Sequence, residues 1–125
     1  MTTALSTEAF SLAIEDGDDL CNIIGNIIFL DKSCIVWIGK AESAPTLENL
    51  VMSMPTRFEA YPLSSMLLGN DVENDANATG ISQRLSKKFN IQAFVSSSVA
   101  LNHDGMKTIE SLLIELLQNH QNAVI

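Results

Sequence analysis

The chain has 125 residues, 46% of them apolar, which predicts a single globular domain over residues 1–125 whose core needs no disulfide or metal. Fifteen acidic and seven basic residues give a net charge of −8, which disfavours binding to nucleic acid or to an anionic membrane. The longest apolar run, 34–38, is too short to cross a bilayer, and the N-terminus lacks the pattern of a signal peptide. We therefore expect a cytoplasmic protein, with the nucleus as an additional location.

The first part of the chain predicts three consecutive strands. From Glu8 to Ile14 large side chains alternate with small ones, which is the period of a strand. An Asp- and Gly-rich turn then leads into strands over 20–30 and 34–39. Both faces of these two strands are apolar, whereas a solvated face would carry polar residues at alternate positions. Each face of the sheet must therefore be covered.

The middle of the chain predicts two short strands, a loop and a helix. The strands, over 50–54 and 63–68, are bounded by proline and glycine. Six of the nine residues over 70–78 are Asn, Asp or Glu, so we expect a polar surface loop there. Thr79 is then the expected N-cap of a helix over 79–90.

The remaining residues predict a sixth strand over 91–98 and a helix over 104–120, with Asp104 as its cap and a broad apolar stripe along it. The expected fold class is α+β, a six-stranded mostly antiparallel sheet with two helices packed on one face. Two helices cannot cover both faces. We therefore expect the other face to be used for dimerisation.

Four isoleucines of the second strand are candidates for that pairing face. Ile24 and Ile28 point to one side of the sheet, and Ile23 and Ile27 point to the other. The sequence leaves open which side the partner covers. A charge on the pairing side should break association, whereas a charge on the other side should unfold the protein.

The sequence offers little catalytic chemistry. His103 and His120, the two histidines, are expected at the surface, and Ser82 lacks the second glycine of a nucleophile elbow. Cys21 and Cys34 are expected to be buried free thiols, and twelve residues between them do not suit a zinc site. We therefore predict no enzymatic activity, no metal and no cofactor.

Three of the seven basic residues, Arg84, Lys87 and Lys88, fall within five positions of the predicted helix. They form either an ordinary solvated face or an electrostatic docking patch for a protein partner. An enzyme that holds an anion between Gly69 and Arg84, at the expected helix start, is a further alternative.

Several short strings, in this order and spacing, resemble the proteasome assembly chaperone 4 family. They are Ile35-Val36-Trp37-Ile38-Gly39, Asn49-Leu50 with Met54, Pro62-Leu63-Ser64 with Leu67-Leu68-Gly69, Thr79-Gly80-Ile81 with Gln83-Arg84-Leu85 and Lys88, and Phe94-Val95-Ser96. The resemblance implies a six-stranded antiparallel sheet with helices. It also implies a non-enzymatic chaperone that pairs with its paralogue, proteasome assembly chaperone 3, and helps to assemble the α-subunit ring of the 20S core particle.

The resemblance gives roles to individual residues. It implies that Trp37 packs in the core or at the pairing face, that Gly39 and Gly69 lie in turns, and that Gly80 follows a helix cap. Arg84, Lys87 and Lys88 become candidates for contact with a proteasome α subunit. Two alternatives remain open: a homodimer of the isolated chain, and a roadblock- or longin-like homodimeric scaffold that binds trafficking proteins or small GTPases.

Overall fold

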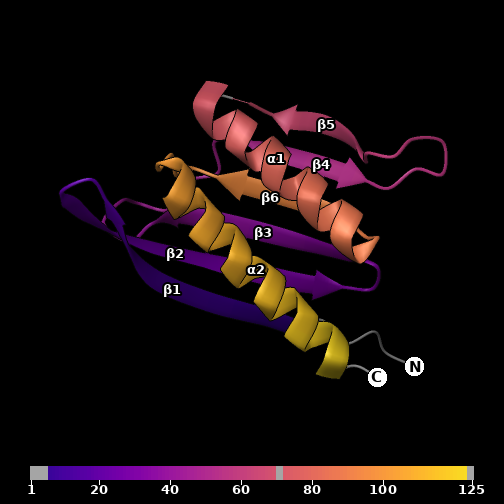
Figure 1. Cartoon of the computed structure of the whole chain (residues 1–125), viewed down its shortest axis with the longest axis horizontal. Coiled ribbons are helices and arrows are strands. Elements are labelled where there is room, and N and C mark those ends of the chain that lie inside the picture. The colour runs from indigo at the N-terminus through magenta and orange to yellow at the C-terminus, as the bar shows by residue number, and fades with distance from the viewer. Residues whose placement is uncertain (1–5, 70–71, 124–125) are drawn as a thin grey trace.

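The computed structural model describes residues 6–69 and 72–123, which form a sheet with two helices lying across one of its faces (Figure 1). The elements are β1 (Ser6–Asp16), β2 (Asp19–Leu30), β3 (Ser33–Lys40), β4 (Leu50–Met54), β5 (Leu63–Leu68), α1 (Val72–Phe89), β6 (Gln92–Ser97) and α2 (His103–Ala123). The predicted α+β class, with two helices on one face, is confirmed.

The strand order in the sheet is β1-β2-β3-β6-β4-β5. Every neighbouring pair is antiparallel except β3 and β6, which are parallel. The parallel pair arises because α1 carries the chain back across the sheet before β6 inserts between β3 and β4. The last strand in the sequence is therefore central in the sheet.

The strand register places successive residues on opposite faces. Ile27 of β2 pairs with Val36 of β3, which pairs with Val95 of β6, and all three are fully buried. They belong to one core cluster with the apolar residues of α1 and α2. We call this side of the sheet the helix-covered face. The next register row, Ile28, Ile35, Phe94 and Met52, lies on the opposite side, the helix-free face.

Helix α1 begins at Val72, seven residues before the predicted start, so the expected polar loop over 70–78 is wrong from 72 on, and residues 70 and 71 lie outside the described part of the chain. Thr79 is not a cap, because it lies inside the helix and its hydroxyl donates to the Asp75 carbonyl at 2.8 Å. Small side chains on one side of α1, including Ala78, Ser82 and Ser86, are buried where the helix contacts β4 and β6. These tertiary contacts stabilise a helix that the polar composition of the segment disfavours.

The other boundaries agree with the prediction to within three residues, and those of β4 and β5 agree fully. The cap of α2 differs, because the Asn102 side chain, not that of Asp104, accepts a hydrogen bond from the Gly105 amide at 2.8 Å. Gly39 lies inside β3 and Gly80 inside α1, so their expected positions in a turn and after a cap are wrong. Gly69, also expected in a turn, does not have the positive φ for which a turn would require glycine.

Candidate protein-binding surfaces

The helix-free face carries a continuous apolar row across the middle of the sheet. Ile28, Ile35, Phe94 and Met52 follow one another on β2, β3, β6 and β4 through the strand register. Each of them is only half-buried. Among the residues that the structure describes, neither helix lies over this row (Figure 1). The row is therefore available to a second protein.

Trp37 is on the same face, with its ring over Gly39. Its indole Nε1 donates to the Thr46 carbonyl at 2.9 Å, which ties the ring to the loop after β3. A Cβ on Gly39 would lie 2.6 Å from the Trp37 ring atom Cη2, so only glycine leaves room for the ring in this position. Gly39 therefore serves the packing of Trp37 and not a turn.

A shallow hollow of about 350 Å³ opens beside Trp37. Ala9 and Ser11 of β1 and Ile24 and Asn26 of β2 contribute to its lining. The hollow forms because the β1 side chains on this face are small. The face therefore has both a ridge, the apolar row, and a depression. Side chains of two packed sheets interdigitate through such features.

The two pairs of isoleucines lie on opposite faces, and only one of these faces is covered by the helices. Ile23 and Ile27 are fully buried on the helix-covered face, whereas Ile24 and Ile28 are half-buried on the helix-free face. Ile24, Ile28 and Trp37, all predicted partner-binding residues, thus share one face.

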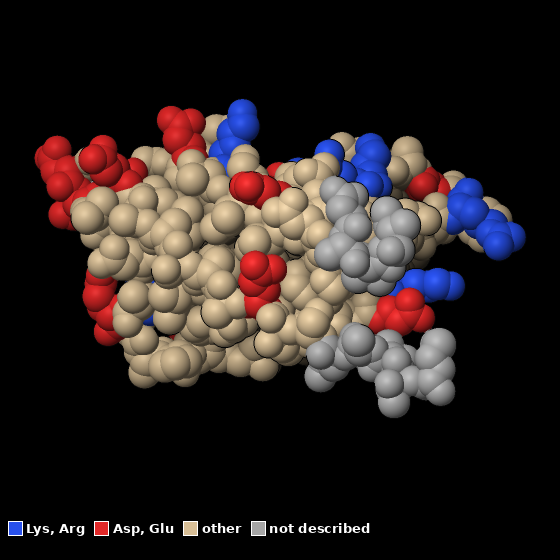
Figure 2. All heavy atoms as spheres, turned by 90° about the horizontal axis from the view of Figure 1, so that it is seen from below, with Lys and Arg blue, Asp and Glu red and all other residues tan. Residues whose placement is uncertain are grey.

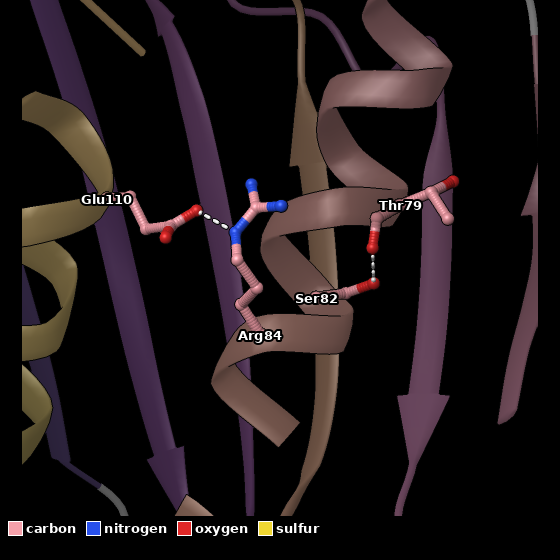
Figure 3. A network of polar contacts seen from close by, with 4 residues as sticks. All are labelled: Thr79, Ser82, Arg84 and Glu110. Carbon is pink, nitrogen blue, oxygen red and sulfur yellow. Dashed lines mark hydrogen bonds and ion pairs between the residues drawn. The ribbon is translucent and has the colours of Figure 1, made fainter. Parts of the chain in front are cut away.

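The three basic residues of α1 have different neighbours. Arg84 Nε lies 2.6 Å from Glu110 Oε1, an ion pair that joins α1 to α2 (Figure 3). Lys87 turns the other way, with its Nζ 4.4 Å from the centre of the Tyr61 ring. Lys88 lines a hollow of about 520 Å³ at the ends of α1 and α2. Helical spacing makes both Lys87 and Lys88 neighbours of Arg84, so it is the contacts with α2 and with Tyr61 that send these side chains to different places.

The alternative of an enzyme that holds an anion between Gly69 and Arg84 assumed that a helix starts at Thr79, and the helix does not start there. Thr79 and Gly80 lie in the middle of α1, where backbone amides are already bonded within the helix. Ser82, expected in the first turn, is buried mid-helix, and its hydroxyl donates to the Thr79 carbonyl at 2.9 Å (Figure 3). Because that proton is used, the 2.7 Å contact between Ser53 and Ser82 has Ser53 as the donor.

Both cysteines are free thiols, with Cys34 buried and Cys21 half-buried. Burial raises the pKa of Cys34 to about 12, so this thiol stays protonated at neutral pH and is a poor nucleophile. Within 6–69 and 72–123, no group of three or more His, Cys, Asp or Glu residues could hold a metal ion. No helix in that same part of the chain is long and apolar enough to cross a membrane.

The two histidines differ in environment. His103 is exposed at the start of α2, as predicted. His120 is half-buried, and its ring stacks on Phe29 with 3.9 Å between the ring centres and 10° between the planes. The predicted surface position thus holds only in part for His120, because the stack covers one side of its ring and joins the end of α2 to β2.

Sequence reasoning overlooked Phe58 and Tyr61. Both are strongly exposed, and both lie in the loop between β4 and β5, which Pro55 and Pro62 bracket. The signal was present in the composition, because only 6% of the chain is aromatic and two of these residues fall within four positions.

A family model described as "Proteasome assembly chaperone 4" matches residues 22–99, from β2 through β6. The chain belongs to the proteasome assembly chaperone 4 family. Human proteasome assembly chaperone 4 is 38% identical over 71 residues, which are 57% of this chain and 54% of the human protein. The mouse protein is 32% identical over 75 residues, 60% of this chain and 57% of its own length. The match thus spans about half the length of these relatives.

A solved structure agrees in fold over nearly the whole chain. It is a chain of a structure titled "Crystal Structure of a Novel Chaperone Complex for Yeast 20S Proteasome Assembly". The TM-score is 0.53 with 15% sequence identity, and the match covers 94% of each chain. The shared fold includes β1 and α2, which lie outside the family match at 22–99. The middle of the chain therefore carries the sequence signature, and the ends agree through architecture.

Proposed function

We propose that this protein is a non-enzymatic chaperone that pairs with the paralogous proteasome assembly chaperone 3 through its helix-free face. The pair then binds an α subunit of the 20S proteasome and promotes assembly of the α ring. Membership of the proteasome assembly chaperone 4 family is the observation that carries this proposal. The helix-free face supports the pairing.

The physical argument for pairing is the apolar area that the helices leave open. Buried apolar surface contributes roughly 25 cal/mol per Å² before the costs of ordering are subtracted. The row Ile28, Ile35, Phe94 and Met52 crosses the four inner strands, so a second sheet can cover it in one layer. Two sheets packed face to face bury such rows against each other at about 10 Å separation.

The absence of enzymatic activity is part of the same proposal. Ser82 donates a hydrogen bond to a backbone carbonyl and not to a base, and Cys34 is held protonated, so neither is an activated nucleophile. The roadblock- or longin-like alternative is not favoured, since those folds place a helix between early strands. Here β1, β2 and β3 follow one another without one.

The test is light scattering on the purified chain, on chaperone 3 and on their mixture, followed by capture of individual α subunits by the mixture. We expect a heterodimer in the mixture and binding of an α subunit by the pair, with weaker binding by either chain alone. A chain that is monomeric alone and stays monomeric in the mixture would contradict the pairing. A homodimer that chaperone 3 does not exchange into a heterodimer would contradict the choice of partner.

A further inference from the structure

Charge is unevenly distributed along the strands. Figure 2 shows a cluster of Asp and Glu at its left end, whereas its right end carries most of the visible Lys and Arg with some Asp or Glu among them. The acidic end contains the β1–β2 turn, with Glu15, Asp18 and Asp19. The opposite end is where β2 passes into β3 and β4 passes into β5, at Lys32 and Arg57. The same two turns also carry Asp31 and Glu59, so their charge is mixed, and this end becomes net positive only with Lys87 and Lys88 at the end of α1.

The strand register confirms which segments share the basic end. Ser33 pairs with Gln92, directly after α1, and Ser53 pairs with Ala93. The end of α1 and the loop over 55–62 therefore lie at the same end of the sheet. Lys87 of α1 and Tyr61 of the loop are in contact there, with 4.4 Å between the Lys87 Nζ and the ring centre.

The loop over 55–62 is held in place at several points. The Phe58 amide donates to Thr56 Oγ1 at 3.2 Å, which fixes the turn at the tip. Pro62 is buried at the end of the loop, and Lys87 packs over Tyr61. Proline restricts the backbone on both sides of the turn. A partner that binds this loop therefore pays little conformational entropy for ordering it.

The tip of the loop presents Arg57 and Phe58 to solvent. Phe58 is 87% exposed, the highest value among the described large apolar side chains. Single exposed apolar residues are common on protein surfaces and need no function. Here, however, Tyr61 at 62% and Leu63 at 55% exposure continue the apolar surface, and the charged residues beside it are Arg57, Glu59 and Lys87. Aromatic residues and arginine are also the types that dominate binding energy at interfaces.

We infer that the tip of this loop docks on the proteasome α subunit, in an apolar pocket rimmed by carboxylates. Phe58 fills the pocket, and Arg57 and Lys87 face the rim. The inference rests on the proposed function and assigns a surface to it. The proposed function supplies the occupant, and charge sets the chemistry of its pocket: carboxylates on the rim complement Arg57 and Lys87, the cations beside the apolar tip, on a chain that is acidic elsewhere. The loop extends beyond the sheet in Figure 1, so pairing through the helix-free face leaves its tip free.

The test measures binding of the preformed pair with chaperone 3 to the α subunit that the wild-type pair captures. Phe58→Ser should weaken this affinity by more than about tenfold, as expected for the loss of a central aromatic anchor. Leu47→Ser is the matched control, because Leu47 is also a strongly exposed apolar residue in a loop, between β3 and β4. The control should stay within about twofold of wild type, as expected for a residue outside the interface.

The charge is tested by association rates at low and high salt. Arg57→Glu should slow association at low salt by about tenfold and lose most of that effect at high salt. Lys107→Glu makes the same charge change on α2 and should leave the rate near that of the wild type. Circular dichroism on each variant confirms that it is folded.

The outcomes separate the inference from the function beneath it. If the wild-type pair binds an α subunit and Phe58→Ser binds it equally well, the docking site is wrong and the proposed function stands. If Phe58→Ser instead weakens pairing with chaperone 3, the loop belongs to that interface and the inference is overturned. If the wild-type pair binds none of the α subunits, both fail.

Discussion

Ile23 and Ile27 are fully buried, whereas their sequence neighbours Ile24 and Ile28 are only half-buried. These four side chains are chemically identical and come from one strand, so residue type does not explain the difference. The helices do, because α1 and α2 pack against the face that holds Ile23 and Ile27. An apolar residue on the covered face stabilises the fold, and the same residue on the open face is available for association.

The largest expected effects come from placing a charge on each face in turn: one substitution should unfold the protein, and the other should abolish pairing. Ile27→Asp places an unpaired carboxylate in the core, a cost comparable to a typical total stability of about 5–15 kcal/mol, so the protein should unfold. Ile28→Asp should stay folded, with a loss below about 2 kcal/mol, and should fail to pair with chaperone 3. Urea denaturation and light scattering measure the two effects. Equal destabilisation by both substitutions would contradict the difference between the faces.

A smaller effect is expected from the fit of Trp37 over Gly39. Gly39→Ala puts a methyl group into the space of the indole and should cost about 2 kcal/mol of stability, as for other overpacked sites. Trp37 is the single tryptophan, so its fluorescence reports the displacement directly. In a Trp37→Phe background the smaller ring leaves room, and the same substitution should then cost less. An equal cost in both backgrounds would assign the effect to the backbone of β3.

The buried thiol of Cys34, on the helix-covered face, predicts that the stability of the protein depends on pH. The pKa of Cys34 is raised from 9.0 to about 12 by burial, so between these values the unfolded chain releases a proton that the folded chain keeps. Stability should therefore fall as pH rises above 9, by about 1.4 kcal/mol per pH unit at most from this group. Cys34→Ala removes this contribution. The denaturation midpoint should change less between pH 8 and pH 10 for this variant than for the wild type. An equal change in both proteins would contradict the assignment of the pH dependence to Cys34.

The smallest effect is expected from the ion pair between the two helices. Arg84 and Glu110 are 57% and 18% exposed, so solvent screens their attraction, and their coupling should be below about 1 kcal/mol. A double-mutant cycle of Arg84→Gln and Glu110→Gln, at low and high salt, measures it. A coupling of several kcal/mol that persists at high salt would show that the covering helices depend on this charge pair and not mainly on apolar packing.

Local sequence determined most of the secondary structure. The bounds of β4 and β5 follow from short apolar runs between proline and glycine, and the other strands follow from alternation. The start of α1 could not be found this way, because Asn, Asp and Glu between 72 and 78 have weak or mixed preferences on their own. The helix forms there because Asp75 and Ala78 are buried and extend the packed side of Ser82 and Ser86, where α1 contacts β4 and β6.

For the candidate partner-binding residues, too, some features followed from the sequence and others only from the packing. That Ile24 and Ile28 share a face follows from the two-residue period of a strand, and the free apolar face was expected from counting two helices against six strands. Which face is free, the one with Trp37 or the opposite one, depended on where the helices pack. Likewise, proximity in sequence grouped Arg84 with Lys87, but in space Arg84 pairs with Glu110 and Lys87 with Tyr61.

The sequence by itself thus determined the strands, the fold class and an excess of apolar surface over what two helices cover. Tertiary structure alone decided which face is covered, which cations are paired, and that Phe58 stands at the tip of a held loop. The physical reason is that alternation in a strand is symmetric between its two faces. Only the packing of α1 and α2, through contacts between residues far apart in the chain, makes one face the core and leaves the other open.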